Sequence, residues 1–418
     1  MYKEISKCRI CGNTQLESLI YLGEQTLTGV FPRSKETNIT KGPLELVKCF
    51  SSSGGDVCGL VQLKHSFDSN EMYGENYGYR SGLNQSMVRH LHSIVSEITN
   101  KIPLSEGDII IDIGGNDSTL LQAYPKDKGL NLMVIDPTSK KFKQFYPDHI
   151  KNTADFFSAD TYNKLFDKKA KVITSIAMFY DLEAPLKFVQ DIYDCLDDNG
   201  IWVFEQSYLP FMVDTTSYDT ICHEHLEYYA IEQIKWIFDK IGFKMVDIAF
   251  NNVNGGSFRI MASKSNSNVQ VATEKLKAAI DKENEMGYNK LDIYKVFSDN
   301  VINHKKELLE LLHTLKSQGK KIFGYGASTK GNVLLQYCGL TTNEIPCIAE
   351  VNQDKFGSFT PSTLIPIISE KEAREQNPDY FFVLPWHFRD GIIEREKDFL
   401  NKGGKLIFPL PKIEIYSL

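Results

Sequence analysis

Two histidines and several acidic residues crowd into the segment 218–229. His223, Glu224 and His225 are consecutive, and an acidic residue stands a few positions away on either side. A histidine beside a carboxylate can act as a general base near neutral pH. The triplet would also suit a metal site or a plain surface loop, and we expect only one of its two histidines to face a substrate.

Half of the eight cysteines lie near the amino terminus, at Cys8, Cys11, Cys49 and Cys58. The first two have the spacing of a zinc knuckle, and the second two are more widely separated. In a cytosolic protein, such clustering indicates a metal site before it indicates disulfides. We therefore predict a structural zinc site of four thiolates, with unrelated buried thiols as the alternative.

A glycine pair follows the apolar run 109–113, which is typical of a buried strand. Gly114 and Gly115 would form a tight turn at the carboxyl end of that strand, where doubly wound sheets bind nucleotides. Asp136 ends the next predicted strand, and an acid there can bind both ribose hydroxyls. Because the third glycine of a dinucleotide motif is missing, the pattern favours S-adenosylmethionine over NAD. A generic strand-to-helix turn is the alternative.

A second glycine-rich turn, 324–332, follows a predicted strand and precedes a helix. Its backbone N–H groups and Lys330 would form an anion site. The order of a Walker loop is absent, so the diphosphate of a substrate fits better than ATP hydrolysis. Trp386 and His387 follow a later strand and could stack on a base or sugar. A plain turn and core packing are the respective alternatives.

Two series of strands and helices would position these residues. The first favours a mostly parallel sheet covered on both faces, closed by an antiparallel pair that is joined through 252–256. The second is a smaller Rossmann-like unit. The predicted strands are 109–113, 130–135, 172–176, 201–205, 245–250, 257–262, 322–325, 347–350, 380–384 and 405–408. The predicted helices are 118–124, 185–196, 231–241, 332–338 and 392–402, with one or two more within 270–318.

These patterns predict an α/β protein: a central Rossmann-like sheet of the class I methyltransferase type, flanked by a small zinc domain and a second Rossmann-like domain. Residues 1–66 hold too few apolar side chains for a stable core, which is why we expect zinc to hold them together. The expected division is a zinc-binding domain at 1–66, a methyltransferase domain at 67–265, connecting helices at 266–318 and a Rossmann-like domain at 319–418. A helix is also expected before the first strand, because Met87, Leu91, Ile94, Val95 and Ile98 recur at helical spacing.

Length and composition narrow the class of protein. The 418 residues call for two or three domains, and 42% hydrophobic with 24% charged residues is typical of a globular protein. A formal charge of −7 argues against a broad surface that binds nucleic acid or an anionic membrane. The start lacks an apolar signal core, and no apolar run is long enough to span a membrane. We therefore expect a cytoplasmic monomer or small homo-oligomer with no nucleic-acid or membrane partner.

Taken in order, these motifs resemble one family, the nucleotide-sugar C-methyltransferases of deoxysugar biosynthesis. The resemblance covers essentially the whole chain. The segments that carry it are the cysteine pairs, 59–63, 77–81, 112–121, 135–137, 223–225, 255–259 and 324–332.

The resemblance implies an S-adenosylmethionine-dependent enzyme with structural Zn²⁺. Its carboxy-terminal domain would hold the nucleotide diphosphate (dTDP-, CDP- or GDP-linked) of a 4-keto-6-deoxyhexose. His225 would be the base, with Glu224 beside it, and Tyr77, Tyr79 or His223 would stabilise the enolate oxygen. The expected methyl-donor site comprises Asp112, Gly114, Asn116, Asp136, Pro137, Phe157 and Met178. The expected substrate site comprises Arg80, Ser328, Lys330, Asn332, Trp386 and His387.

The expected reaction is methylation at C3 of the keto sugar through an enolate. Methylation of a sugar oxygen or nitrogen is an alternative in the same class. A zinc protein that only binds a nucleotide is an alternative from another class. Three positions differ from the family pattern: Cys222 replaces Tyr, Asn254 replaces His and Ser362 replaces Gly. These differences bear on which sugar and which carbon are used.

Overall fold

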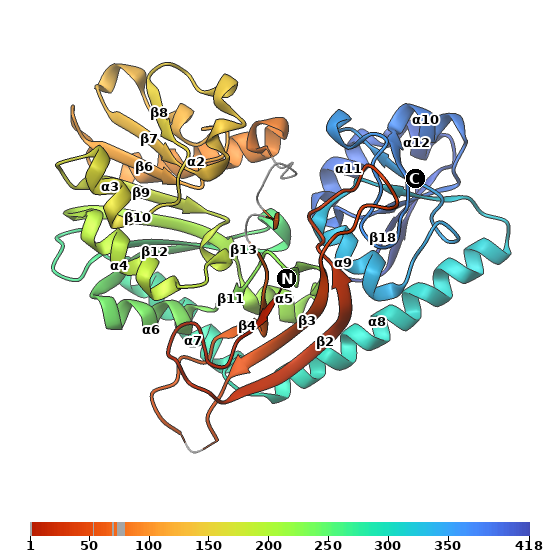
Figure 1. Ribbon diagram of the computed structural model, residues 1–418, viewed down its shortest axis with the longest axis horizontal. Helices are drawn as coiled ribbons and strands as arrows, with labels where there is room; N and C mark the ends of the chain where they lie inside the picture. The colour runs from red at the N-terminus through yellow and green to blue at the C-terminus, as the bar shows by residue number, and fades with distance from the viewer. Residues whose placement is uncertain (1, 53, 69–70, 73–79) are drawn as a thin grey trace.

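The computed structural model describes residues 2–52, 54–68, 71–72 and 80–418, and Figure 1 shows three bodies around a common centre. A large sheet lies on one side, a smaller sheet rich in blue on the other, and a long red hairpin between them. Tyr77 and Tyr79 lie outside the described residues. We call the three sheets central, carboxy-terminal and amino-terminal.

The central sheet has seven strands in the order β12-β13-β10-β9-β6-β7-β8. Strands β8, β7, β6, β9 and β10 are parallel, whereas β13 runs antiparallel to both of its neighbours. The antiparallel edge therefore lies where the sequence predicts it. The strand bounds are β6 (Ile109–Ile113), β7 (Asn131–Ile135), β8 (Ile150–Thr153), β9 (Ala170–Ile176), β10 (Leu196–Ser207), β12 (Phe243–Asn251) and β13 (Ser257–Lys264).

Helices cover the central sheet. They are α2 (Gln85–Lys101), α3 (Ala159–Leu165), α4 (Pro185–Cys195) and α6 (Ile231–Ile241). The buried residues of α2 are the five whose spacing predicts a helix there. The helix predicted at 118–124 is wrong, because the structure has only a 3₁₀ turn, Leu121–Ala123. Ser118 adopts a left-handed conformation (φ 66°) and Pro125 follows closely, so too few residues remain for an α-helix.

The amino-terminal sheet contains one strand from a distant part of the chain. Its order is β11-β4-β3-β2, with β2 (Leu16–Thr26), β3 (Lys41–Cys49), β4 (Val61–Leu63) and β11 (Glu227–Tyr228). Strand β11 directly follows the His223–His225 triplet. The segment that carries the candidate base is therefore part of the cysteine-bearing sheet. A short pair, β1 (Lys3–Glu4) and β5 (His65–Ser66), lies alongside.

Two helices connect the central sheet to the carboxy-terminal sheet, α7 (Thr273–Met286) and α8 (Asp292–Ser317), and the short α5 (Leu209–Asp214), which follows β10, packs against α8. The long α8 runs beneath the red hairpin toward the blue body (Figure 1) and contacts β2, α5 and α9. Its buried face includes Tyr294, Phe297, Val301, Leu308 and Leu312. This helix therefore packs against all three bodies.

The carboxy-terminal sheet has the order β16-β15-β14-β17-β18-β19, parallel except for β19. The helix predicted at 392–402 is interrupted at Glu396, whose buried carboxylate accepts hydrogen bonds from Tyr325 and Arg374. The strands are β14 (Ile322–Tyr325), β15 (Ile348–Glu350), β16 (Ile367–Ser369), β17 (Tyr380–Val383), β18 (Lys405–Phe408) and β19 (Glu414–Tyr416). The helices are α9 (Thr329–Cys338), α10 (Glu370–Glu375), α11 (Arg389–Arg395) and α12 (Lys397–Asn401).

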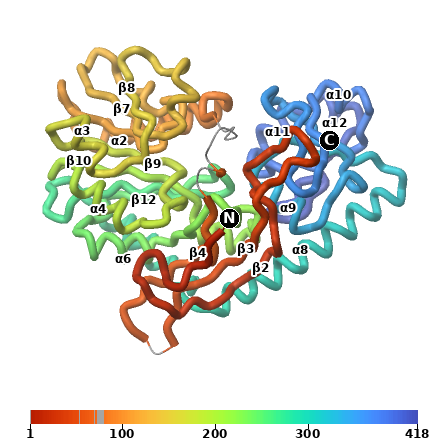
Figure 2. Tube along the Cα trace, in the orientation of Figure 1, coloured from red at the N-terminus to blue at the C-terminus, as the bar shows by residue number. Residues whose placement is uncertain are grey.

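One apolar core extends through the three sheets, from Cys8 and Leu46 through Trp202 and Phe204 to Phe381 and Phe408. The tube in Figure 2 shows the red segment lying against both the green and the blue parts of the chain. No helix in the described ranges combines the length and apolarity needed to cross a bilayer.

Candidate active site

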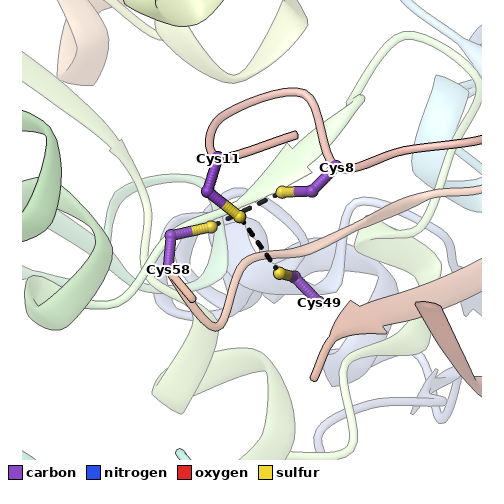
Figure 3. A group of neighbouring side chains, drawn as sticks. All are labelled: Cys8, Cys11, Cys49 and Cys58. Carbon is purple, nitrogen blue, oxygen red and sulfur yellow. Dashed lines mark hydrogen bonds between the residues drawn. The ribbon is translucent and has the colours of Figure 1, made fainter. Parts of the chain in front are cut away.

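The four amino-terminal cysteines come together at one point, as Figure 3 shows. Cys8 and Cys11 lie on a loop before β2, Cys49 ends β3, and Cys58 precedes β4. Their sulfur atoms all lie within 4.8 Å of one another, and Cys8–Cys58 and Cys11–Cys49 are 3.4 Å apart. The amide of Asn13 donates to Cys49 Sγ at 3.4 Å, which holds the loop around the thiols.

These thiols fit a tetrahedral zinc site. Four Zn–S bonds of 2.3 Å place the sulfurs about 3.8 Å apart, which falls between the two separations above. Close contact with the thiol of Cys11 raises the pKa of Cys58 well above its usual range. A cation is therefore needed before all four groups can be thiolates.

The glycine turn after β6 is tight and poor in side chains. A Cβ on Gly115 would lie 2.7 Å from Asp112 Oδ2 and 3.0 Å from Val134, and one on Gly114 would lie 3.3 Å from Met178. Asp112 is buried beneath the turn and accepts a 2.6 Å hydrogen bond from Thr174. Burial raises the pKa of Asp112 to about 7.

Asp136 lies across from this turn, at the end of β7. Its Oδ2 accepts from the backbone N–H of Asn116 at 2.7 Å, and its Oδ1 accepts from the N–H of Thr138 at 2.6 Å. Pro137 follows as the first residue of a 3₁₀ turn, Pro137–Lys140. A carboxylate fixed at the carboxyl edge of the sheet, next to a turn without side chains, suits the ribose and the adjoining chain of a nucleoside.

Met178, Phe157 and Arg80 extend this region. Met178 follows Ala177, which adopts a left-handed conformation (φ 54°) just past β9. Phe157 is half-buried and packs edge-on against Phe188. Arg80 lies 3.7 Å from Asp117 and its guanidinium covers the ring of Phe145. The structure therefore places Arg80 beside the glycine turn after β6.

A turn separates the two histidines of the triplet. The N–H of His225 donates to the carbonyl of Cys222 at 3.1 Å, which closes the turn. His223 is fully buried and packs edge-on against Phe67 of the amino-terminal body, 4.5 Å between ring centres. The structure does not bring it to the half-buried ring of His225, which lies edge-on to Tyr180.

The hydrogen bond of His225 determines which ring nitrogen is basic. Nδ1 lies 3.0 Å from the carbonyl oxygen of Thr220. A carbonyl only accepts, so Nδ1 carries the proton and Nε2 keeps a lone pair. Burial, and after it the positive charge of Lys330, lower the pKa of His225 to about 3. His225 is thus a neutral base at physiological pH.

Glu224 points toward the amino-terminal body. Thr28 Oγ1 donates to Glu224 Oε2 at 3.3 Å. A Cβ on Gly29 would lie 2.3 Å from Glu224 Oε1, so only glycine leaves room for this carboxylate. Burial raises the pKa of Glu224. The segment after β2 therefore determines where Glu224 lies.

Residues of the second glycine-rich turn make contacts between bodies. Lys330 Nζ donates to the carbonyl of Asn254 at 2.5 Å, and Asn332 Nδ2 donates to the carbonyl of Thr28 at 2.7 Å. Ser328 caps α9 by accepting from the N–H of Gly331. The side chains of this turn thus join the carboxy-terminal body to the other two.

Trp386 also makes a contact between bodies. It is buried, and its indole N–H donates to Asp219 Oδ2 at 2.7 Å. The polar edge of the Trp386 ring is therefore paired within the protein, and its stacking on a base or sugar stays a prediction. His387 is half-buried beside it, and burial lowers its pKa to about 3.

Several residues near His225 were not singled out from the sequence. Thr220 orients the imidazole, Tyr180 packs against it, and Thr28 and Gly29 surround Glu224. None of the four belongs to a motif with a characteristic spacing. Only Asp219 had a signal, because it lies in the same segment as the histidines.

Three family models match consecutive parts of the chain. "Putative zinc binding domain" matches residues 8–73, "Methyltransferase domain" residues 87–248 and "C-methyltransferase C-terminal domain" residues 252–411.

Known proteins are similar to the chain over different lengths. The C-methyltransferase NovU of Streptomyces niveus is 26% identical over 419 residues, which cover 99% of this chain and 98% of NovU. "Probable inactive O-methyltransferase 11" of Dictyostelium discoideum is 26% identical over 140 residues, 32% of this chain and 36% of the relative. The cyclopropane synthase MmaA2 from Mycobacterium tuberculosis has a TM-score of 0.32 at 12% identity, over 41% of this chain and 84% of that chain.

Each of the three matched regions contains one of the structural features described above. The cysteine cluster lies in the first matched region, the glycine turn after β6 in the second, and the second glycine-rich turn in the third. The chain is therefore an S-adenosylmethionine-dependent methyltransferase whose successive regions are similar to a zinc-binding domain, a methyltransferase domain and the carboxy-terminal domain of C-methyltransferases.

Proposed function

We propose that the enzyme methylates C3 of a nucleotide-diphosphate-linked 4-keto-6-deoxyhexose. The observation that carries the proposal is the hydrogen bond from His225 Nδ1 to Thr220, which leaves Nε2 free to take a proton. A proton on the carbon next to a ketone is acidic enough for a histidine to remove. Deprotonation of a hydroxyl group, as in O-methylation, would not need a neighbouring ketone. NovU, to which the chain is similar, is a C-methyltransferase.

In the proposed reaction, His225 Nε2 takes the C3 proton and the electron pair of that C–H bond forms the enolate. Bound S-adenosylmethionine supplies an electrophilic methyl group: a C–C bond forms at C3 as the S–CH₃ bond breaks, and its electron pair stays on sulfur. Lys330 is the nearby cation that can stabilise the enolate oxygen. Glu224, held by Thr28, limits how the sugar can enter. Holding both reactants in line accounts for much of the acceleration.

The donor would be held at the glycine turn after β6. Asp136 binds the ribose hydroxyls in this proposal, and Gly114, Asn116, Pro137, Phe157 and Met178 line the nucleoside and the methionine chain. Asp112 supports the turn from below through its bond to Thr174. Zn²⁺ bound by the four cysteines has only a structural role in this proposal.

The nucleotide of the sugar would lie toward the carboxy-terminal body. Backbone N–H groups at the start of α9 face a diphosphate in this proposal, because Ser328 caps the helix and the side chain of Asn332 bonds to Thr28. His387 would border the sugar. The domain division at 66, 265 and 318 belongs to the same proposal, with β11 as an addition to the amino-terminal sheet.

The test is His225→Ala with the exposed His313→Ala of α8 as its matched control. Loss of a general base costs about 10²- to 10⁴-fold in turnover. We expect a loss in this range, with unchanged affinity for S-adenosylmethionine by calorimetry and a control that behaves as the wild type. Wild-type turnover by His225→Ala on every keto-sugar nucleotide that binds would falsify the proposal.

NMR of the product identifies the methylated atom. A methyl singlet on a quaternary carbon supports methylation at C3. A methyl signal with the shift of an O-methyl or N-methyl group would replace the proposal with sugar O- or N-methylation, for which the same base would deprotonate a heteroatom.

A further inference from the structure

Arg9 lies between two of the four clustered cysteines, yet its side chain turns away from them. Its backbone N–H donates to Gln62 Oε1 at 3.1 Å, Nη1 donates to the carbonyl of Leu63 at 2.7 Å, and Nη2 donates to Ser66 Oγ at 2.8 Å. The side chain is only 3% exposed. These hydrogen bonds attach Arg9 to strand β4 and to the residues that follow it.

The same guanidinium also lies near β11, the strand that follows the candidate base His225 in the chain. Arg9 Nε lies 3.7 Å from Glu227 Oε1, and the side chain of Glu227 is fully buried. Glu183 Oε2 lies 3.5 Å from the same nitrogen but is largely exposed. Burial raises the pKa of Glu227 well above its usual range, and the charge of Arg9 opposes that rise. Asp181 and Glu183 are the other charged groups that act on Glu227.

Strands β4 and β11 are joined at this point. Glu227 pairs with Gln62 and Tyr228 with Val61, and the N–H of Leu63 donates to the carbonyl of Leu226 at 2.8 Å. Leu226 is the residue directly after His225. His225, Thr220 and Glu227 together line one small cavity of about 10 Å³, so Glu227 lies close to the imidazole and to the residue that orients it.

We infer that Arg9 is a positioning residue: held between two zinc ligands, it fixes β4 against β11 and thereby the orientation of His225. The backbone pairing of β11 spans only two residues, which is too short to hold a strand without side-chain support. Arg9 supplies that support in two directions, to Leu63 and Ser66 on one side and to Glu227 on the other. The cysteines on both sides of Arg9 restrict its backbone.

The prediction for turnover rests on the proposed role of His225, but the structural prediction does not. Removing Arg9 leaves the buried carboxylate of Glu227 without its cation, which is costly unless the strand shifts or the carboxylate takes up a proton. The same change removes the hydrogen bonds from Arg9 to Leu63 and Ser66, so we expect the amides around His225 to open more easily. We expect the backbone amides of β11 to lose protection against hydrogen exchange while the metal site stays intact.

The experiment compares Arg9→Met and Arg9→Lys with Lys7→Met, an exposed cation next to the same zinc ligand, Cys8. Hydrogen–deuterium exchange by mass spectrometry follows the segments 222–229 and 108–117, and elemental mass spectrometry counts zinc. We expect about one zinc per chain in every variant. For both Arg9 variants we expect roughly tenfold faster exchange in 222–229. Segment 108–117 and Lys7→Met should match the wild type.

A lysine cannot reproduce the planar, divergent contacts of a guanidinium, so Arg9→Lys should not restore protection. If Arg9→Met fails to fold, Arg9→Lys, which keeps the charge, is the variant that decides. The double variant Arg9→Met/Glu227→Gln removes the unpaired charge and should regain part of the protection. Turnover should fall at least about tenfold in the single Arg9 variants, with KM for S-adenosylmethionine unchanged.

Two results would overturn the inference. If exchange in 222–229 stays at the wild-type rate, Arg9 does not hold β11. If the Arg9 variants lose zinc, their effects pass through the metal site and not through the strand. Because exchange and zinc content are measured without an acceptor sugar, these results are independent of whether His225→Ala proves the proposed base wrong.

Discussion

The glycine turn after β6, our proposed donor site, and the loop around His225, our proposed base, are built differently. Every contact described for the turn comes from the central body: Asp112, Thr174, Asp136 and Met178 all lie on or next to its strands. The loop depends on all three bodies. It receives Thr28 from the amino-terminal body, Thr220 from its own segment and Lys330 from the carboxy-terminal body.

From this difference we expect donor binding and base positioning to be separable in this enzyme. A change in the amino-terminal or carboxy-terminal body can move the base while the donor site stays intact. Additivity is expected for sites without shared partners, and the two regions share none of the contacts above. The following predictions test that separation, from the largest expected effect to the smallest.

Asp136→Asn should weaken binding of S-adenosylmethionine about 10- to 100-fold, because a charged hydrogen-bond acceptor is worth about 1.5–3 kcal/mol. Isothermal titration calorimetry gives the affinity, and the exposed Asp148→Asn is the matched control. Hydrogen exchange in 222–229 should not change. An affinity within about threefold of the wild type would show that Asp136 does not contact the donor.

Gly29→Ala should lower turnover about tenfold without changing affinity for the donor. Its φ lies outside the left-handed region, so strain is not the cause; the added Cβ would lie 2.3 Å from Glu224 Oε1 and push the carboxylate away. Gly391→Ala is the control, because a Cβ there has open space. Steady-state kinetics and calorimetry separate the two effects. Equal losses in turnover and donor affinity would contradict the separation of the two regions.

Lys330→Met should move the acid limb of the kcat/KM profile to higher pH. The Lys330 cation disfavours protonated His225, so its removal raises the pKa of His225 above about 3, while burial, the larger cause, still keeps it below 6.5. The base is lost as pH falls through that pKa, and above pH 7 titration has no effect. Asp219, Cys222 and His387 are the other titratable groups that sense this cation.

Profiles of the wild type, Lys330→Met and the exposed Lys306→Met test this shift. The control should retain the wild-type limb. A limb that stays in place or moves to lower pH in Lys330→Met would show that Lys330 does not act on the base.

Much of the local structure follows directly from the sequence. The predicted bounds of β6, α6, β14 and β18 agree with the structure, and the buried face of α2 is the predicted one. The cysteine cluster also forms as its spacing indicates. The helix predicted at 118–124 is wrong because Ser118 has a local left-handed backbone. The helix predicted at 392–402 forms as α11 and α12, with an interruption at Glu396, whose partners are distant in the chain.

The candidate site was less accessible to sequence reasoning. His225 and Asp136 lie in recognisable motifs, whereas Thr28, Gly29 and Thr220 do not. Lys330, Asn332 and Trp386 are predicted to contact a substrate; the structure adds that their side chains also bond to Asn254, Thr28 and Asp219, and the substrate contacts stay a prediction. A motif indicates that a polar side chain has a partner, but it does not say which one.

The sequence by itself determined the α/β class, the cysteine cluster, the glycine turn after β6 and the segment that carries the candidate base, because apolar periodicity and turn chemistry depend on residues close in the chain. Only the tertiary structure decided that β11 completes the cysteine-bearing sheet, that a turn separates His223 from His225, and that Arg9 reaches Glu227. These contacts join residues far apart in the chain. Their geometry depends on how three packed bodies share one core, which no local pattern records.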